Sequence, residues 1–205
     1  MEWEEERYPK TVVTQQTSLS ISDSLIHLIP SPVASHSDHD MIVHVPFADV
    51  VFAGDIAFVG TTPIVWAGKF RDCVTACDFV ANVGAKYYVP GHGAITNKEY
   101  VSYVLKPYWQ HLEAKYLKEC DIRSDAEACA EKVCADLPQV YTMWNDPTRC
   151  VINVMVHHAK VTGEEVKGKF AFMIKQQHYR LFGTLGNVTE AAQKGGHAQQ
   201  GKSEL

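Results

Sequence analysis

Residues 35–58 read SHSDHDMIVHVPFADVVFAGDIAF, and the fold can be predicted outward from this stretch. A polar cluster of histidines and aspartates is followed by two apolar runs, MIVHVP and DVVFAGD, which predict β-strands. The second run is continuously apolar and ends in Gly-Asp, as in a buried strand whose last residues reach the edge of a sheet. We therefore expect Asp55 at a strand end and His36 in the loop before the first of the two strands.

A third polar loop follows a strand farther along the chain. The run KYYVP, residues 86–90, predicts a short strand, and it leads into PGHG, where His92 stands between two glycines. Apolar residues at helical spacing from Phe70 onward, with Gly84 as a stop, predict a helix before this strand. Strands that alternate with helices indicate an α/β layered architecture, in which loops at strand ends converge.

His36, Asp55 and His92 are thus three side chains able to bind a metal, each in a tight loop beside a strand. Asp55 follows His36 by 19 residues (55 − 36), and His92 follows Asp55 by 37 residues (92 − 55). A carboxylate can bridge two cations, and a neutral imidazole ligates zinc or iron through one nitrogen. The sequence therefore predicts a metal centre formed by these three residues.

The motifs around these residues resemble those of the metallo-β-lactamase-fold superfamily of hydrolases. In that family a His in an H-[ST]-x-G-D loop ligates the first metal, an Asp in a strand-end G-D bridges two metals, and a His in P-G-H-G ligates the second. His36, Asp55 and His92 match these positions in turn. The resemblance implies a metal-dependent hydrolase in which water activated by one or two metal ions attacks an ester, thioester, lactone or similar bond. It implies zinc as the metal, with iron or manganese as alternatives, Asp55 as the catalytic residue and a small molecule as the substrate.

The first part of the chain departs from the family pattern. The superfamily motif H-x-H-x-D-H is missing, because no H-x-H occurs in the sequence and only 35 residues precede His36. We therefore expect a partial metallo-β-lactamase (αββα sandwich) fold with two ligands per ion, where a catalytic zinc needs three. The missing N-terminal half would be supplied by a partner chain or be lost through an incomplete gene model, and a homo-oligomer is the other expected partner. The alternative function is a non-catalytic half-fold remnant that acts as a binding or regulatory module.

Other histidines and aspartates leave two interpretations open. His39 or Asp40 could join the three residues in a rebuilt mononuclear site, or His39 and His44 are solvated or hydrogen-bonded side chains. His157 and His158 are neighbours in a predicted helix, so their side chains point about 100° apart and cannot both face one ion. We expect these two histidines to be packing or surface residues.

The chain divides into three predicted parts. Residues 1–106 would form the C-terminal half of a metallo-β-lactamase-like domain, and residues 107–183 a C-terminal helical extension. Within this extension, residues 107–144 would cover the site or form a dimer contact. Residues 184–205 are polar and rich in Gly and Gln, which is typical of a disordered tail.

Composition argues against some classes of binding partner and predicts a cellular location. A net charge of −5 without a long basic run argues against nucleic acid and an anionic membrane surface as partners. No apolar run reaches the roughly 18 to 20 residues of a membrane span, and no G-x-G-x-x-G or P-loop motif is present. Six cysteines without a signal peptide predict reduced thiols and a cytoplasmic protein.

Overall fold

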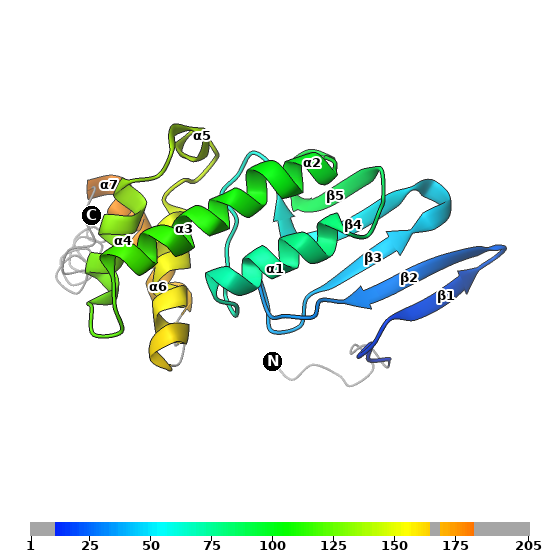
Figure 1. Ribbon diagram of the computed structural model, residues 1–205, viewed down its shortest axis with the longest axis horizontal. Coiled ribbons are helices and arrows are strands. Elements are labelled where there is room, and N and C mark those ends of the chain that lie inside the picture. The colour runs from blue at the N-terminus through cyan, green and yellow to red at the C-terminus, as the bar shows by residue number, and fades with distance from the viewer. Residues whose placement is uncertain (1–10, 165–168, 183–205) are drawn as a thin grey trace, which may run out of the picture.

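The computed structural model describes residues 11–164 and 169–182. Within them a five-stranded sheet lies beside a set of helices, and several of these helices follow the sheet in the sequence (Figure 1). The mixed α/β class predicted from the sequence is confirmed. The strands are β1 (Thr17–Ile21), β2 (Ser24–Pro30), β3 (Met41–Val45), β4 (Val50–Phe58) and β5 (Tyr87–His92).

The strand order in the sheet follows the order in the chain, β1-β2-β3-β4-β5. The first three pairings are antiparallel, and only β4 and β5 run parallel. The parallel pairing needs a crossover, and helix α1 (Phe70–Ala81) supplies it. The strand that contains Asp55 and the strand that ends at His92 are therefore neighbours that point the same way.

The two faces of the sheet have different surroundings. Along β4, Val51 and Ala53 are fully buried, while Phe52 between them is 46% exposed. The buried set faces α1, whose apolar side includes Phe70 and Val80, both fully buried. On the opposite face, apolar side chains of the strands remain exposed, namely Leu19, Ile21, Met41, Phe52 and Tyr87. One face of the sheet is thus a core and the other is open.

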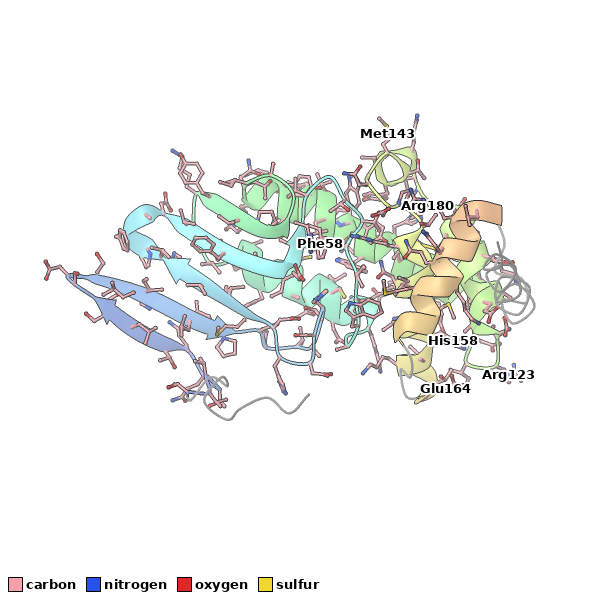
Figure 2. All side chains as sticks on the ribbon, turned by 180° about the vertical axis from the view of Figure 1, so that it is seen from behind. Phe58, Arg123, Met143, His158, Glu164 and Arg180 are labelled. Atoms are coloured by element: carbon pink, nitrogen blue, oxygen red, sulfur yellow. A yellow bond between two sulfur atoms is a disulfide. The ribbon has the colours of Figure 1, made fainter. Side chains whose placement is uncertain are left out.

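The remaining helical elements are η2 (Pro46–Ala48), α2 (Lys98–Tyr100), the π-helical η3 (Val101–Leu105), α3 (Lys106–Glu119), α4 (Ala126–Ala135), α5 (Gln139–Thr142), α6 (Arg149–Thr162) and α7 (Lys169–Phe182). Helix α6 lies at the centre of the helical part, because ten of its consecutive residues, 150–159, are buried. Helix α7 packs along it (Figure 2). Gly163 ends α6 with a left-handed φ of 78°.

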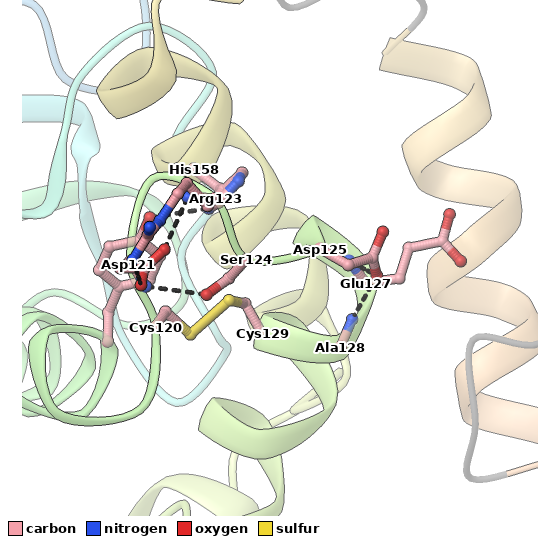
Figure 3. The surroundings of a disulfide bond; sticks show 10 residues. Cys120, Asp121, Arg123, Ser124, Asp125, Glu127, Ala128, Cys129 and His158 are labelled. Atoms are coloured by element: carbon pink, nitrogen blue, oxygen red, sulfur yellow. Dashed lines mark hydrogen bonds and ion pairs between the residues drawn. A yellow bond between two sulfur atoms is a disulfide. The ribbon is translucent and has the colours of Figure 1, made fainter.

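Two disulfides tie the helices together. Cys120 at the end of α3 is bonded to Cys129 of α4 (Figure 3), and Cys134 of α4 is bonded to Cys150 of α6. In both pairs the Cα atoms lie 5.8 Å apart, within the usual range for a disulfide. The prediction of reduced thiols is therefore wrong for these four cysteines. Their spacing in sequence does not reveal which ones helix packing brings together.

The other two cysteines agree with the prediction. Cys73 and Cys77 are free and lie on the buried side of α1, and burial raises the pKa of both thiols. They act as small apolar side chains of the core.

Some predictions fall outside what the structure describes. The predicted tail, residues 184–205, lies beyond the described residues, and the division of the chain into three parts stays a prediction. In the described ranges, no helix combines the length and the apolar character that a membrane span requires. The cytoplasmic location also stays a prediction.

Candidate metal centre

Asp55 lies within β4, three residues before its end at Phe58, and a backbone irregularity precedes it. The register between β4 and β5 shifts on both sides of Gly54, whose φ of +53° is left-handed. Such a bulge re-aims the side chain that follows it, and glycine adopts this backbone angle without steric cost. In the Gly-Asp pair noted in the sequence, the glycine therefore orients the side chain of Asp55 toward the neighbouring loops.

The structure brings the three predicted residues together. Nε2 of His36 lies 3.2 Å from Oδ2 of Asp55, and Nε2 of His92 lies 3.4 Å from Oδ1. The side chains are 22% exposed for His36, 34% for Asp55 and 54% for His92, so the group opens to solvent on the His92 side. One carboxylate therefore stands between two imidazoles, with one oxygen for each.

The hydrogen-bond partner of Nδ1 of His36 determines whether Nε2 of the same ring can bind a ligand. Its Nδ1 lies 2.8 Å from the backbone carbonyl oxygen of Ile64. A carbonyl can only accept a hydrogen bond, so Nδ1 carries a proton and donates it. In the neutral ring the lone pair is then on Nε2, and it points at the acceptor Oδ2 of Asp55. Two acceptors repel at this distance, so a proton or a cation belongs between them.

The PGHG loop places His92 by sterics and by stacking. A Cβ on Gly91 would overlap Oδ1 of Asp55, and a Cβ on Gly93, where φ is +98°, would overlap the backbone oxygen of Val59. The two glycines thus let the loop lie directly against β4. The ring of His92 stacks on Phe58 with 4.7 Å between centroids and 15° between planes. Phe58 fixes the plane of the imidazole.

The loop that contains His36 is organised by Asp40. Its carboxylate accepts hydrogen bonds from the hydroxyls of Ser35 and Ser37, both at 2.6 Å, and from the backbone N–H groups of the same two residues. These donors occupy both oxygens, so Asp40 shapes the loop and does not join the three residues. His39 is exposed to solvent. Neither residue completes a mononuclear site.

The donor chemistry fits a metal, but the number of ligands is small. Among residues 11–164 and 169–182, no three or more His, Cys, Asp or Glu side chains are grouped so that they could hold an ion. The arrangement is two pairs that share Asp55. Two ligands bound at about 2.0–2.1 Å to one tetrahedral zinc lie about 3.3 Å apart, and the observed pairs at 3.2 and 3.4 Å match that spacing. Each pair offers two of the three protein ligands of a catalytic zinc.

Sequence reasoning missed two residues that position His36. The β4–α1 loop (residues 59–69) contains Ile64, and two buried side chains of α6 hold this loop. Asn153, which is fully buried, accepts from the N–H of Val65 at 3.0 Å and donates to the carbonyl of Pro63 at 2.9 Å. Asn153 and His157 are one helical turn apart in an apolar run of α6. This polar pair is the sequence feature that could have revealed their role.

His157 holds the far end of the same loop. Its Nδ1 accepts a hydrogen bond from the N–H of Phe70, the first residue of α1, at 3.0 Å. Burial, with smaller contributions from the charges of Lys69 and His158, lowers the pKa of His157 to about 4. The ring is therefore neutral at physiological pH and stays an acceptor. His158 is buried too, as expected of a packing residue, and its Nδ1 lies 2.7 Å from the hydroxyl of Tyr116.

These observations define the class of protein. It is an α/β protein with a His–Asp–His group where two parallel strands end. Comparison with known proteins adds a family match for part of the chain. Residues 4–92 match the family model described as "Metallo-beta-lactamase superfamily". The resemblance inferred from the sequence motifs is confirmed for this segment, which contains all three site residues. The superfamily is of hydrolase type, and no curated protein matched the chain.

Solved structures support the same fold. The chain is similar to a metallo-beta-lactamase family protein from Thermus thermophilus, with 17% identity over 72% of this chain and 47% of that one, at a TM-score of 0.52. It is also similar to the stereoselective inverting sec-alkylsulfatase Pisa1 from Pseudomonas sp., with 10% identity over 84% of this chain and 30% of that one, at a TM-score of 0.53. These likenesses show the fold, and the expected partial metallo-β-lactamase fold is confirmed. The chain spans less than half of the length of either structure.

Proposed function

We propose that this chain acts in metal-dependent hydrolysis of a small molecule, with His36, Asp55 and His92 as metal ligands. The observation that supports the proposal is the placement of one imidazole Nε2 against each oxygen of Asp55, at 3.2 and 3.4 Å. A negative carboxylate between two nitrogen donors is a favourable environment for a divalent cation. Zinc is the proposed metal, with iron or manganese as alternatives.

The residues of the chain have separate tasks in this proposal. Asp55 offers one oxygen to each side, so its carboxylate can hold two cations. The hydrogen bond from His36 to the carbonyl of Ile64 keeps the proton on Nδ1 and leaves Nε2 free to bind. Bound zinc supplies Lewis-acid catalysis and makes water a nucleophile at neutral pH. The bond that is cleaved would be an ester, a thioester, a lactone or a similar group.

Each His–Asp pair still needs further donors. A catalytic zinc takes three protein ligands, and the described residues bring two to each side of Asp55. We propose that the missing donors come from outside the described residues, on a second copy of the chain or on the half of the fold that the solved relatives contain in addition. The open face of the sheet beside β4 is the surface such a half would cover.

Metal content tests the proposal. Purified wild-type chain, equilibrated with zinc and desalted, should retain metal, and Asp55→Ala should lose it, since both pairs depend on Asp55. His39→Ala removes an exposed histidine three residues from His36 and is the matched control that should retain the wild-type content. If Asp55→Ala and His39→Ala retain equal zinc, or if wild type retains none, the three residues are not ligands and the proposal is wrong.

A second function is favoured by the same arrangement of ligands. Because the three side chains form two pairs and not a three-ligand group, a non-catalytic binding or regulatory module also fits the described residues. Hydrolysis separates the two functions. The first predicts zinc-dependent turnover of generic thioester or lactone probes that Asp55→Ala abolishes. The second predicts no turnover of these probes at any zinc concentration.

A further inference from the structure

A cavity of about 490 Å³ lies between α6, α7 and the β4–α1 loop. This volume is within the usual range for a small-molecule site. Two residues of its wall are bonded directly to His36. The carbonyl of Ile64 accepts from the imidazole of His36 at 2.8 Å, and the N–H of Trp66 donates to its backbone oxygen at 3.1 Å. The cavity is therefore adjacent to the candidate metal centre and shares a wall with it.

The inner part of the cavity is apolar. Ile152 of α6 is fully buried, and Ile64 and Trp66 of the loop are half-buried. Met173 of α7 lies at the rim, where it is 51% exposed. Methionine and tryptophan side chains adapt well to a hydrocarbon chain, because both are large and polarizable. This lining suits the apolar part of a ligand.

The rim of the cavity is polar and has an excess of positive charge. Asp146 is shared by two arginines: its Oδ2 lies 3.3 Å from Nη2 of Arg149, and its Oδ1 lies 3.6 Å from Nη1 of Arg180. Among the described residues that line the cavity, Asp146 is the only acidic one, so the two guanidinium groups leave a net charge of +1. Such a rim attracts an anion.

The two arginines differ in how much hydrogen-bonding capacity they retain. Arg149 also donates to the carbonyl of Thr62 at 3.2 Å and holds the β4–α1 loop, so its role is largely structural. Arg180 has a 57% exposed side chain, and in the described part of the chain Asp146 is its ion-pair partner. A guanidinium has five N–H donors in a planar fork that matches a carboxylate or a similar anion. Arg180 is thus the group available to a ligand, and Figure 2 labels it on α7.

We propose that this cavity binds an amphiphilic organic anion, with its apolar chain on Ile64, Trp66 and Ile152 and its anionic group on Arg180. The anion is the non-reacting part of the substrate, and this last statement rests on the proposed function. The shared wall at Ile64 and Trp66 places the cavity where a substrate could extend from it toward Asp55. Gln177, which is exposed on α7, adds an amide at the same rim.

Octanoate and its neutral counterpart octanamide test the proposal by calorimetry on the full chain. Wild type should bind octanoate more tightly than octanamide. Arg180→Gln should weaken octanoate binding at least about tenfold, the usual effect of losing a hydrogen bond to a charged group, and should leave octanamide binding unchanged. Met173→Gln should weaken both ligands. Arg123→Gln, which changes an exposed arginine paired with Asp121 outside the cavity, is the matched control and should change neither.

Two results would overturn the proposal: octanamide binding as tightly as octanoate in wild type, or equal octanoate affinity of Arg180→Gln and Arg123→Gln. The binding assay is performed in chelator, so its outcome is independent of metal and turnover. Octanoate binding retained by Asp55→Ala, together with no zinc retention by wild type, would refute the proposed function and leave the cavity assignment intact. Zinc-dependent turnover without octanoate binding would do the reverse.

Discussion

Two regions of this protein use histidines in opposite ways. At the candidate metal centre, His36 and His92 are partly exposed and direct Nε2 at a carboxylate. On α6, His157 and its helical neighbour Asn153 are buried, and their polar atoms are bonded to the backbone of the β4–α1 loop and its junction with α1.

The difference teaches what a polar residue needs in order to bind a ligand. In the buried region these side chains bond the protein's own backbone, so they fix a loop and have little capacity left. In the exposed region Nδ1 of His36 donates a hydrogen bond to Ile64, whereas Nε2 faces a carboxylate oxygen, which is not a donor. The partner of the second ring nitrogen separates a structural histidine from a candidate ligand.

The largest effect is expected when Asn153 is changed to Ala, which would break the buried region. The substitution leaves the N–H of Val65, the carbonyl of Pro63 and the hydroxyl of Tyr108 without a partner in a dry interior. Urea denaturation should show a loss of about 3–5 kcal/mol in the free energy of unfolding. Asn97→Ala, which removes the exposed N-cap of α2, is the matched control and should lose about 1 kcal/mol. Equal losses would show that the contacts of Asn153 do not hold the loop.

A smaller effect, specific to pH, is expected from His157. Its pKa is lowered from an ordinary 6.5 to about 4 in the folded protein, so the fold favours the neutral ring. Stability from this group is complete above pH 6.5 and falls as the pH drops from 6.5 to 4, by about 3 kcal/mol in all. The measurement is the free energy of unfolding at several pH values in that range.

The substitution His157→Gln isolates this pH dependence. Gln can still accept from the N–H of Phe70 but does not titrate, so the slope between pH 6.5 and 4 should flatten. His39→Gln changes an exposed histidine and should keep the wild-type slope. A His157→Gln protein with an unchanged slope would mean that other groups cause the acid sensitivity.

The smallest effect on stability is expected at the candidate metal centre, from Gly91→Ala. The new methyl group would overlap Oδ1 of Asp55 and push the carboxylate away from His92. We expect a loss of about 1–2 kcal/mol in unfolding free energy, as for other overpacked positions, together with lower zinc retention. Gly84→Ala adds a methyl group in open space at a left-handed φ, so it should strain the backbone and leave zinc retention unchanged. Equal zinc retention by the two variants would contradict this assignment.

Much of the fold and the convergence of the three site residues could be predicted from local sequence. Gly54 before Asp55, and the two glycines beside His92, are local patterns, because the backbone angle or close approach that requires glycine lies at the same position. The apolar run of β4 and the helix after it are local patterns too, and together they imply the parallel β4–β5 pair.

The parts that could not be predicted depend on contacts between distant residues. Asn153 and Val65 are 88 positions apart, and no local pattern shows that one bonds the other. The disulfide between Cys134 and Cys150 depends on how α4 packs against α6, which spacing does not reveal. The same is true of the cavity, since Arg180 and Trp66 meet only after α7 has packed against α6.

The β4–α1 loop is bonded on both sides, to α6 through Asn153 and to the backbone and ring of His36 through Trp66 and Ile64. Because both sides of the loop are fixed by these hydrogen bonds, a displacement on one side is transmitted to the other. A ligand that displaces the loop from the cavity side should also reorient the imidazole of His36. A cation bound to that imidazole should in turn make the wall of the cavity more rigid. By thermodynamic reciprocity, a ligand in the cavity would change the affinity of His36 for a cation by the same factor as the cation changes the affinity of the cavity.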